Sequence, residues 1–137
     1  MINDIIGNKT LIPILKKILD LGAVRHRVIA QNIANASTNG YRKKSVDFEE
    51  SLQSLLQMHR DGSITEAGDF EGMGNAAAED FRIVESSKKP DAGAPNNVNI
   101  NEEMADLARN HLYYKFAVNM MKRQLAGIKS SITGRVG

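Results

Sequence analysis

The sequence predicts a mostly α-helical protein, in which long N- and C-terminal helices form an antiparallel, coiled-coil-like pair. The first reason is that apolar residues recur at helical spacing near both ends of the 137-residue chain. The second is that tryptophan is absent and aromatic residues make up only 5% of the chain, which suits aliphatic packing between helices. The third is a middle segment poor in apolar residues, which we expect to be weakly ordered, with room for a short helix and a short strand.

These observations divide the chain into three segments that together form one extended domain. Residues 1–42 hold the N-terminal helix and a turn, residues 43–97 form the middle insertion, and residues 98–137 hold the C-terminal helix. Neither terminal helix can bury its apolar stripe alone, so we expect the stripes to be satisfied only when the helices meet each other and neighbouring molecules.

The N-terminal helix is predicted from Thr10 to Ala36. Thr10 is a suitable N-cap, and Pro13 falls in the first turn, where its missing N–H costs nothing. The helix should end within residues 37–40, because an Asn-Gly pair favours positive φ. Its apolar stripe consists of Leu11, Ile14, Ile18, Leu21, Val24 and Val28.

The middle segment has too little apolar surface to fold firmly alone. Apolar residues in 48–56 predict a short amphipathic helix over about 46–58, and residues 81–84 predict a short strand. Residues 86–97 contain Pro90 and Pro95 and are predicted to be a linker. The segment is therefore either a mobile insertion or one that becomes ordered only against partners.

The C-terminal helix gives the strongest signal in the sequence. Asn99 can cap its start, with Glu102 in the capping-box position three residues on. Positions then recur at alternating steps of three and four, which is a heptad seam typical of coiled-coil pairing. The seam consists of Met104, Leu107, His111, Tyr114, Val118, Met121, Leu125, Ile128 and Ile132. We expect this seam to pack on the N-terminal stripe, with His111 as a polar interruption that sets the register.

Further apolar residues on this helix, including Leu112, Phe116 and Met120, lie outside the seam. One interpretation is a core helix with a wide buried face. The other is a helix that contacts an intramolecular partner on one side and other subunits on the next. The length and regularity of the helix favour the second, so these three residues are predicted inter-subunit contacts.

The sequence offers no chemistry. It has no cysteine, and its three histidines stand far apart, so no metal or cofactor site is expected. No phosphate-binding loop or nucleophile motif is present, which predicts a protein that is not an enzyme and takes no small-molecule substrate. A net charge of +2 and short basic runs give no reason to expect nucleic acid. Residues 1–22 lack the features of a cleaved secretory signal, and no stretch is apolar enough to span a bilayer.

Two segments resemble a known family. Residues 32–42, NIANASTNGYR, resemble the N-terminal signature of flagellar basal-body rod and hook proteins, which pairs two asparagines with a Thr-x-Gly-Tyr turn. Residues 97–105, NVNINEEMA, followed by Asn110, Tyr114 and Leu125, resemble the matching C-terminal element. The short chain and small middle segment resemble the proximal rod subunit. Asn39 departs from the usual proline of the turn, although asparagine also accepts turn conformations.

The resemblance implies a structural subunit of the proximal rod that polymerises through its terminal helices and transmits motor torque. It implies a periplasmic location in the basal body, reached by flagellar type III export without a cleaved signal. The implied partners are copies of the chain, other flagellar rod proteins and a membrane-ring or export-gate adaptor at the rod base. Competing hypotheses are another secreted helical-hairpin filament or needle subunit, and a coiled-coil nucleic-acid-binding regulator.

Residues of both helices are predicted to serve assembly. The two signature asparagines either cap the end of their helix or hydrogen bond to the backbone of a neighbouring subunit. The glycine of the turn should adopt positive φ, and the tyrosine ring should lie beside the helix pair. The predicted assembly residues are Asn32, Asn35, Thr38, Gly40, Tyr41, Met104, Leu107, His111, Tyr114, Phe116, Val118, Met121, Leu125 and Ile128.

Overall fold

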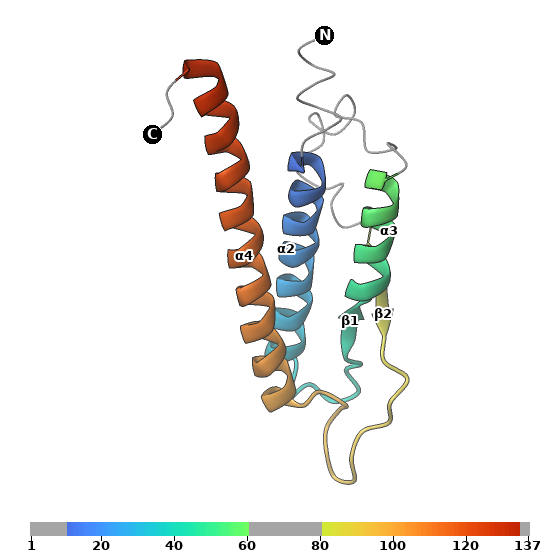
Figure 1. Ribbon diagram of the computed structural model, residues 1–137. Coiled ribbons are helices and arrows are strands. Elements are labelled where there is room, and N and C mark those ends of the chain that lie inside the picture. Colours follow the sequence, from blue (N-terminus) through green and yellow to red (C-terminus); the bar gives the residue numbers. More distant parts are fainter. Residues whose placement is uncertain (1–10, 61–80, 135–137) are drawn as a thin grey trace.

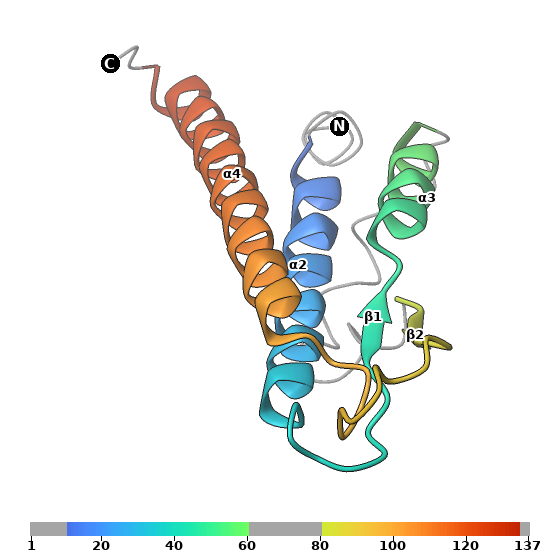
Figure 2. The same ribbon diagram turned by 90° about the horizontal axis from the view of Figure 1, so that it is seen from below.

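Three helices and a two-stranded sheet make up the computed structural model, which describes residues 11–60 and 81–134. Their order is α2 (Ile12–Ala34), β1 (Lys44–Val46), α3 (Phe48–Arg60), β2 (Ile83–Glu85) and α4 (Ile100–Thr133). Helices α2 and α4 run antiparallel, and α3 lies on the other side of α2 (Figures 1 and 2). The predicted fold class, a pair of long terminal helices with a short helix and strand between them, is confirmed.

Helix α2 begins and ends close to the predicted positions. Thr10, the expected cap, lies outside the described residues, and the cap position is Leu11, which makes no side-chain capping bond. Pro13 lies in the first turn as predicted. The helix ends at Ala34, before the predicted turn, and Gly40 has a φ of 75°. A β-carbon is strained at that φ, which explains why glycine occupies the turn.

The middle segment supplies a two-stranded sheet as well as the predicted helix. Strand β2 is close to the predicted position, and it pairs antiparallel with β1, with Ser45 opposite Val84. The sequence analysis missed β1, because Lys44 and Ser45 are polar and Val46 was assigned to the start of the following helix. Val46 of β1 and Phe81, just before β2, are both buried.

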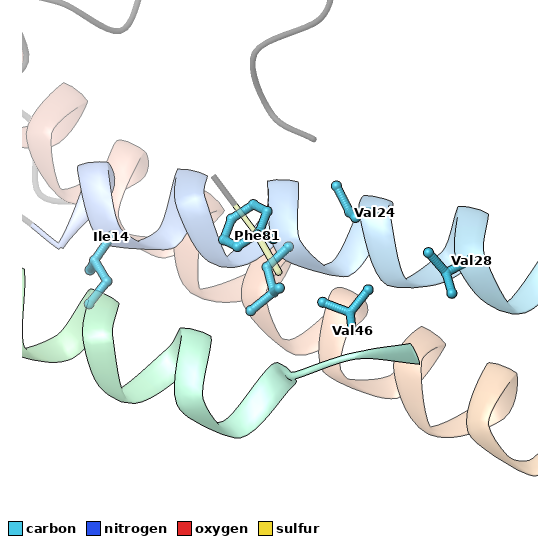
Figure 3. Close-up of a cluster of buried hydrophobic side chains, with 6 residues drawn as sticks. Ile14, Val24, Val28, Val46 and Phe81 are labelled. Carbon is cyan, nitrogen blue, oxygen red and sulfur yellow. The ribbon is translucent and has the colours of Figure 1, made fainter. Parts of the chain in front are cut away.

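The apolar core lies between α2 and this middle segment. Figure 3 shows side chains of this core on α2, on β1 and at Phe81, just before β2. The cluster comprises Ile14, Leu21, Val24, Val28, Val46 and Phe81, with Ile18 and Phe48 packed against it. The expectation that the α2 stripe packs on α4 is therefore wrong. The two-stranded sheet and α3 cover that stripe instead, because their apolar side chains pack against it and remove it from water.

Helix α4 packs on a different face of α2. Its buried residues are Glu103, Asn110 and Ala117, whereas Met104 and Leu125 are about half exposed. The buried residues recur every seven positions, as predicted. Each lies one residue before a predicted seam position (104, 111 and 118). Two of the predicted seam residues, His111 and Ile132, are exposed, and Tyr114 lies at the edge of the interface. The half-buried seam residues are Leu107, Val118, Met121 and Ile128.

Both ends of α4 have capping residues, of which the sequence analysis predicted the first. The side chain of Asn99 accepts hydrogen bonds from the backbone N–H groups of Asn101 and Glu102, as predicted. Gly134 ends the helix in the left-handed conformation. Within residues 11–60 and 81–134, no helix combines the length and the hydropathy needed to cross a bilayer.

Candidate functional site

Asn32 lies at the centre of a buried polar cluster between the two terminal helices. It is 1% exposed, and its amide nitrogen donates to the Lys44 carbonyl at 2.7 Å and to Glu103 Oε2 at 2.9 Å. Its Oδ1 accepts from the Lys44 N–H at 2.9 Å and from the Tyr41 hydroxyl at 3.1 Å. All the hydrogen-bonding groups of this amide are therefore used inside the chain. We call Asn32, Tyr41, Lys43, Lys44 and Glu103 the polar lock.

Glu103 carries the charge of the polar lock. It is 1% exposed, and its Oε1 lies 2.6 Å from Lys43 Nζ, which also approaches the exposed carboxylate of Glu102 at 3.6 Å. A carboxylate this buried needs a cation and a donor, and Lys43 and Asn32 supply them. The lock therefore joins α4 to α2 and to the segment that enters β1.

The surroundings of the polar lock raise the pKa values of Lys43 and Tyr41. Burial lowers the pKa of Lys43, but the hydrogen bond to Glu103 and the charges of Glu103, Glu102 and Asp106 outweigh it, so the pKa is raised above 10.5. Burial, followed by the negative charges of Glu103 and Glu85, raises the pKa of the Tyr41 hydroxyl above 10.0. At neutral pH, Lys43 is therefore a cation and Tyr41 is a neutral donor.

A second polar contact lies further along the helix pair. The amide nitrogen of Asn110 donates to the Gly22 carbonyl at 2.9 Å, and Asn110 is 3% exposed. Gly22 allows this close approach, because a β-carbon there would lie 3.2 Å from Cδ2 of Tyr114. Glycine lowers the stability of a helix interior, and at Gly22 this cost is offset because the missing side chain lets α4 pack closely on α2.

An ionic and aromatic cluster links all three helices. The guanidinium of Arg25 lies 3.9 Å from Asp106 and 5.1 Å above the ring of Phe48. That ring in turn stacks on Tyr113, with the centroids 5.7 Å apart. The start of α3 is thereby attached to both α2 and α4.

The turn after α2 is held by the segment that was predicted to be a linker. Asn96 is 3% exposed and donates to the carbonyls of Asn35, Ala36 and Thr38 at 2.9 to 3.0 Å. The N–H of Gly40 donates to the Pro95 carbonyl at 3.0 Å. Asn96 therefore satisfies the free carbonyls that follow a helix C-terminus.

The structure separates the two signature asparagines by role. Asn35 donates to the Gln31 carbonyl at 2.8 Å and accepts from the Thr38 hydroxyl at 3.2 Å, which are local bonds at the helix end. Asn32 instead bonds to distant segments of its own chain. Tyr41 lies beside the helix pair as expected. Phe116 is 67% exposed, so its predicted contact would have to come from another molecule.

Sequence analysis did not single out Glu103, Lys43 and Asn96. The available signal for Glu103 was its position four residues before Leu107, on the face that the structure buries. A charged residue there did not fit an apolar seam, and only the position of Lys43 makes its burial tolerable. Asn96 is part of an Asn pair next to a proline, which resembles an ordinary loop.

These contacts define a class of fold. Every bond of the polar lock joins one segment of the chain to another, and the described residues hold no group of three potential metal ligands. The fold is a pair of long antiparallel helices, and buried polar groups set their relative position.

Comparison with known proteins identifies the resemblance more closely. The chain is 29% identical over 115 residues to the flagellar basal body rod protein FlgB of Escherichia coli, covering 80% of this chain and 83% of that protein. It is 29% identical over 129 residues to the protein of the same name from Bacillus subtilis, covering 88% and 91%. The corresponding protein of Aeromonas hydrophila is 24% identical over 116 residues, covering 85% and 87%.

No protein-family model matches the chain. The resemblance to flagellar basal body rod proteins is nevertheless confirmed, because proteins of this name from different bacteria match over at least four-fifths of the chain. These relatives are named as rod proteins, which supports a structural protein of the flagellar basal body rod.

Proposed function

We propose that this chain is a structural subunit of the proximal rod of the bacterial flagellar basal body. The observation that carries the proposal is the match to basal body rod proteins over 80% or more of both chains. We further propose that the subunit polymerises through its terminal helices and transmits torque. The alternative, a subunit of another secreted filament, shares the helical hairpin but not this similarity.

The architecture supports a load-bearing role. The polar lock, the contact between Asn110 and Gly22 and the ionic cluster around Arg25 hold α4 to α2 at three separate levels. Directional hydrogen bonds and ion pairs resist sliding of one helix along the other, because any other register leaves buried polar groups unpaired. A subunit with a fixed internal register can pass force to its neighbours without deforming.

The surface of α4 supports polymerisation. Leu112 and Phe116 are each 67% exposed on the side that no described element covers, and Ile132 is 74% exposed. The predicted seam residues Met104, His111 and Leu125 are also exposed. Large apolar side chains along a helix of 34 residues indicate contact with other molecules.

The remaining parts of the proposal follow from the same similarity. The subunit would act in the periplasm after export without a cleaved signal. It would contact copies of itself, other rod proteins and an adaptor at the membrane-ring or export-gate base. It would bind no cofactor, nucleic acid or small-molecule substrate, and it would catalyse no reaction.

The test is to delete the gene, restore it in tagged form and locate the tag in purified basal bodies by electron microscopy. We expect deletion to abolish swimming, and the tag to lie in the proximal rod. Phe116→Asp should prevent rod growth, because it places a charge in an apolar contact. Ile100→Asp is the matched control: Ile100 is 51% exposed, and an acidic residue in the first turn favours the helix dipole. Normal swimming without the gene, or a tag in a different secreted filament, would contradict the proposal.

A further inference from the structure

One side of α4 is basic over most of the helix. No aspartate or glutamate occurs from Leu107 to Thr133, whereas Lys115, Lys122 and Lys129 recur every seven residues and so share one side. All three lysines are exposed, and none is within ion-pair distance of a carboxylate among the described residues. This stretch is therefore a row of positive charge along about 40 Å of helix.

Apolar side chains lie beside that row. Leu112 and Asn119 are seven residues apart, as are Phe116 and Arg123, and all four are exposed. We define the outer face of α4 as Leu112, Lys115, Phe116, Asn119, Lys122 and Arg123. It is turned away from α2, because the residues that α4 buries against α2, Asn110 and Ala117, lie on the opposite side of the helix.

The opposite side of the molecule carries a complementary surface. Helix α3 has Glu49 and Glu50 in its first turn, and both are exposed, as is Gln53. Leu56 is 47% exposed one turn further on. We define Glu49, Glu50, Gln53 and Leu56 as the outer face of α3. Because α3 and α4 flank α2 on either side, one molecule can present both outer faces at once (Figures 1 and 2).

The charges exclude the simplest symmetric contact. Two copies that met through their α4 outer faces would bring two rows of cations together, and juxtaposed like charges repel each other. A contact between α4 of one copy and α3 of the next pairs opposite charges and covers apolar side chains on both sides. In such a head-to-tail contact each copy still has one outer face free to bind a further copy. The contact can therefore repeat from copy to copy and form a ring or an open helix.

We propose that the outer face of α4 docks on the outer face of α3 of a second copy of this chain. The inference rests on the proposed function, because it specifies the surfaces by which the subunit polymerises. In the contact, Lys122 and Arg123 face the carboxylates of Glu49 and Glu50 of the second copy, and Leu112 and Phe116 pack against its Leu56.

The absence of cysteine from the chain makes a direct test possible. A chain carrying Gln53→Cys and Asn119→Cys is produced in cells without the native gene, and purified basal bodies are oxidised mildly. We expect a ladder of cross-linked copies, because a disulfide forms only when the α-carbons approach within about 7 Å. Each single variant and the pair Lys88→Cys with Asn119→Cys are the controls, because Lys88 is exposed in the loop before α4.

Charge exchange tests the same contact independently. Adding Lys122→Glu and Arg123→Glu to the two-cysteine chain should lower the cross-linked product roughly tenfold, because like charges then meet. Adding Glu49→Lys and Glu50→Lys as well should restore it. Circular dichroism must show the same helix content for each variant, so that a loss of fold is not mistaken for a loss of contact.

The outcomes separate this inference from the proposed function. Cross-linking through Asn119→Cys alone would indicate an α4–α4 contact and overturn the inference. So would cross-linking only to a different protein, or no cross-link from a two-cysteine chain that is present in basal bodies; in both cases the proposed function stands. Absence of the unaltered chain from basal bodies would contradict the proposed function and this inference together.

Discussion

The two faces of α2 are held in different ways. The face toward the two-stranded sheet and α3 is aliphatic, with Leu21 fully buried among Val24, Val28 and Phe81. The face toward α4 carries both polar and apolar groups. The Gly22 carbonyl, the Asn32 amide and the Arg25 guanidinium meet Asn110, Glu103 and Asp106 of α4, in that order. Buried Leu15 and Ile29 lie seven residues on either side of Gly22 and so share its side of α2. Apolar contacts contribute most of the free energy but are not directional, whereas the polar contacts add less and require one register. The comparison indicates that the first face makes the molecule stable and that the second determines where α4 lies.

The largest expected effect comes from the aliphatic face. Leu21→Ala should lower the free energy of unfolding by about 3 kcal/mol, because it leaves a cavity in the centre of the core. Leu112→Ala, at a residue that is 67% exposed, is the control and should change stability by less than about 0.5 kcal/mol. Urea denaturation followed by circular dichroism measures both. Equal effects would mean that the cluster around Leu21 is not the core.

The next effect comes from the polar lock. Glu103→Gln keeps the shape of the side chain but removes the charge that pairs with Lys43, so we expect a loss of about 2 kcal/mol. Glu102→Gln removes a neighbouring charge whose side chain is 56% exposed, and it should cost no more than about 0.5 kcal/mol. Urea denaturation compares the two variants. A Glu103 variant as stable as the Glu102 variant would show that the lock does not hold α4.

A smaller difference should appear between two glycines inside helices. Gly127→Ala adds a methyl group with no described atom within 4 Å, so it should stabilise the protein by about 1 kcal/mol through helix propensity. Gly22→Ala has the same intrinsic benefit but presses on Tyr114, so its benefit should be lost. Thermal unfolding of the two variants measures the difference. An equal gain at both sites would mean that α4 does not approach α2 closely at Gly22.

The smallest effect is a loss of stability in alkali. The folded state raises the pKa of Lys43 above 10.5 and that of Tyr41 above 10.0. The unfolded chain therefore releases these protons first, and stability, fully present below about pH 10, decreases as the pH rises toward the folded-state pKa values. Unfolding in urea across this range should show a weaker pH dependence for a variant with Tyr41→Phe and Lys43→Arg. An identical dependence would place the titration outside the lock.

Local signals in the sequence were sufficient for the elements that depend on the chain nearby. Pro13 marked the first turn of α2, Asn99 the start of α4 and Gly40 the positive φ of the turn, because each is a property of a few consecutive residues. The helix in the middle segment was found for the same reason, since its apolar residues repeat with the period of a helix.

The side of α2 on which each partner lies could not be predicted. Periodicity gives the spacing of buried positions, but their phase is inferred from the apolar residues, and in α4 the phase one residue earlier is mostly polar. The apolar phase, with Met104 and Leu125, was the natural choice from composition. The structure instead buries Glu103, which pairs with Lys43 and Asn32, and Asn110, whose amide nitrogen donates to the Gly22 carbonyl while its Oδ1 has no hydrogen-bond partner among the described residues. These partners are distant in the chain.

The sequence by itself determined that the protein pairs two long helices, with Asn99 capping the second, and its signature segments indicated the rod protein resemblance. Only the tertiary structure decided that the apolar stripe of α2 faces the two-stranded sheet and α3, and that buried polar groups of α4 face α2. The physical reason is that caps, turns and periods depend on neighbouring residues. The burial of a charge or an amide is favourable only where partners from elsewhere in the chain come within hydrogen-bond distance.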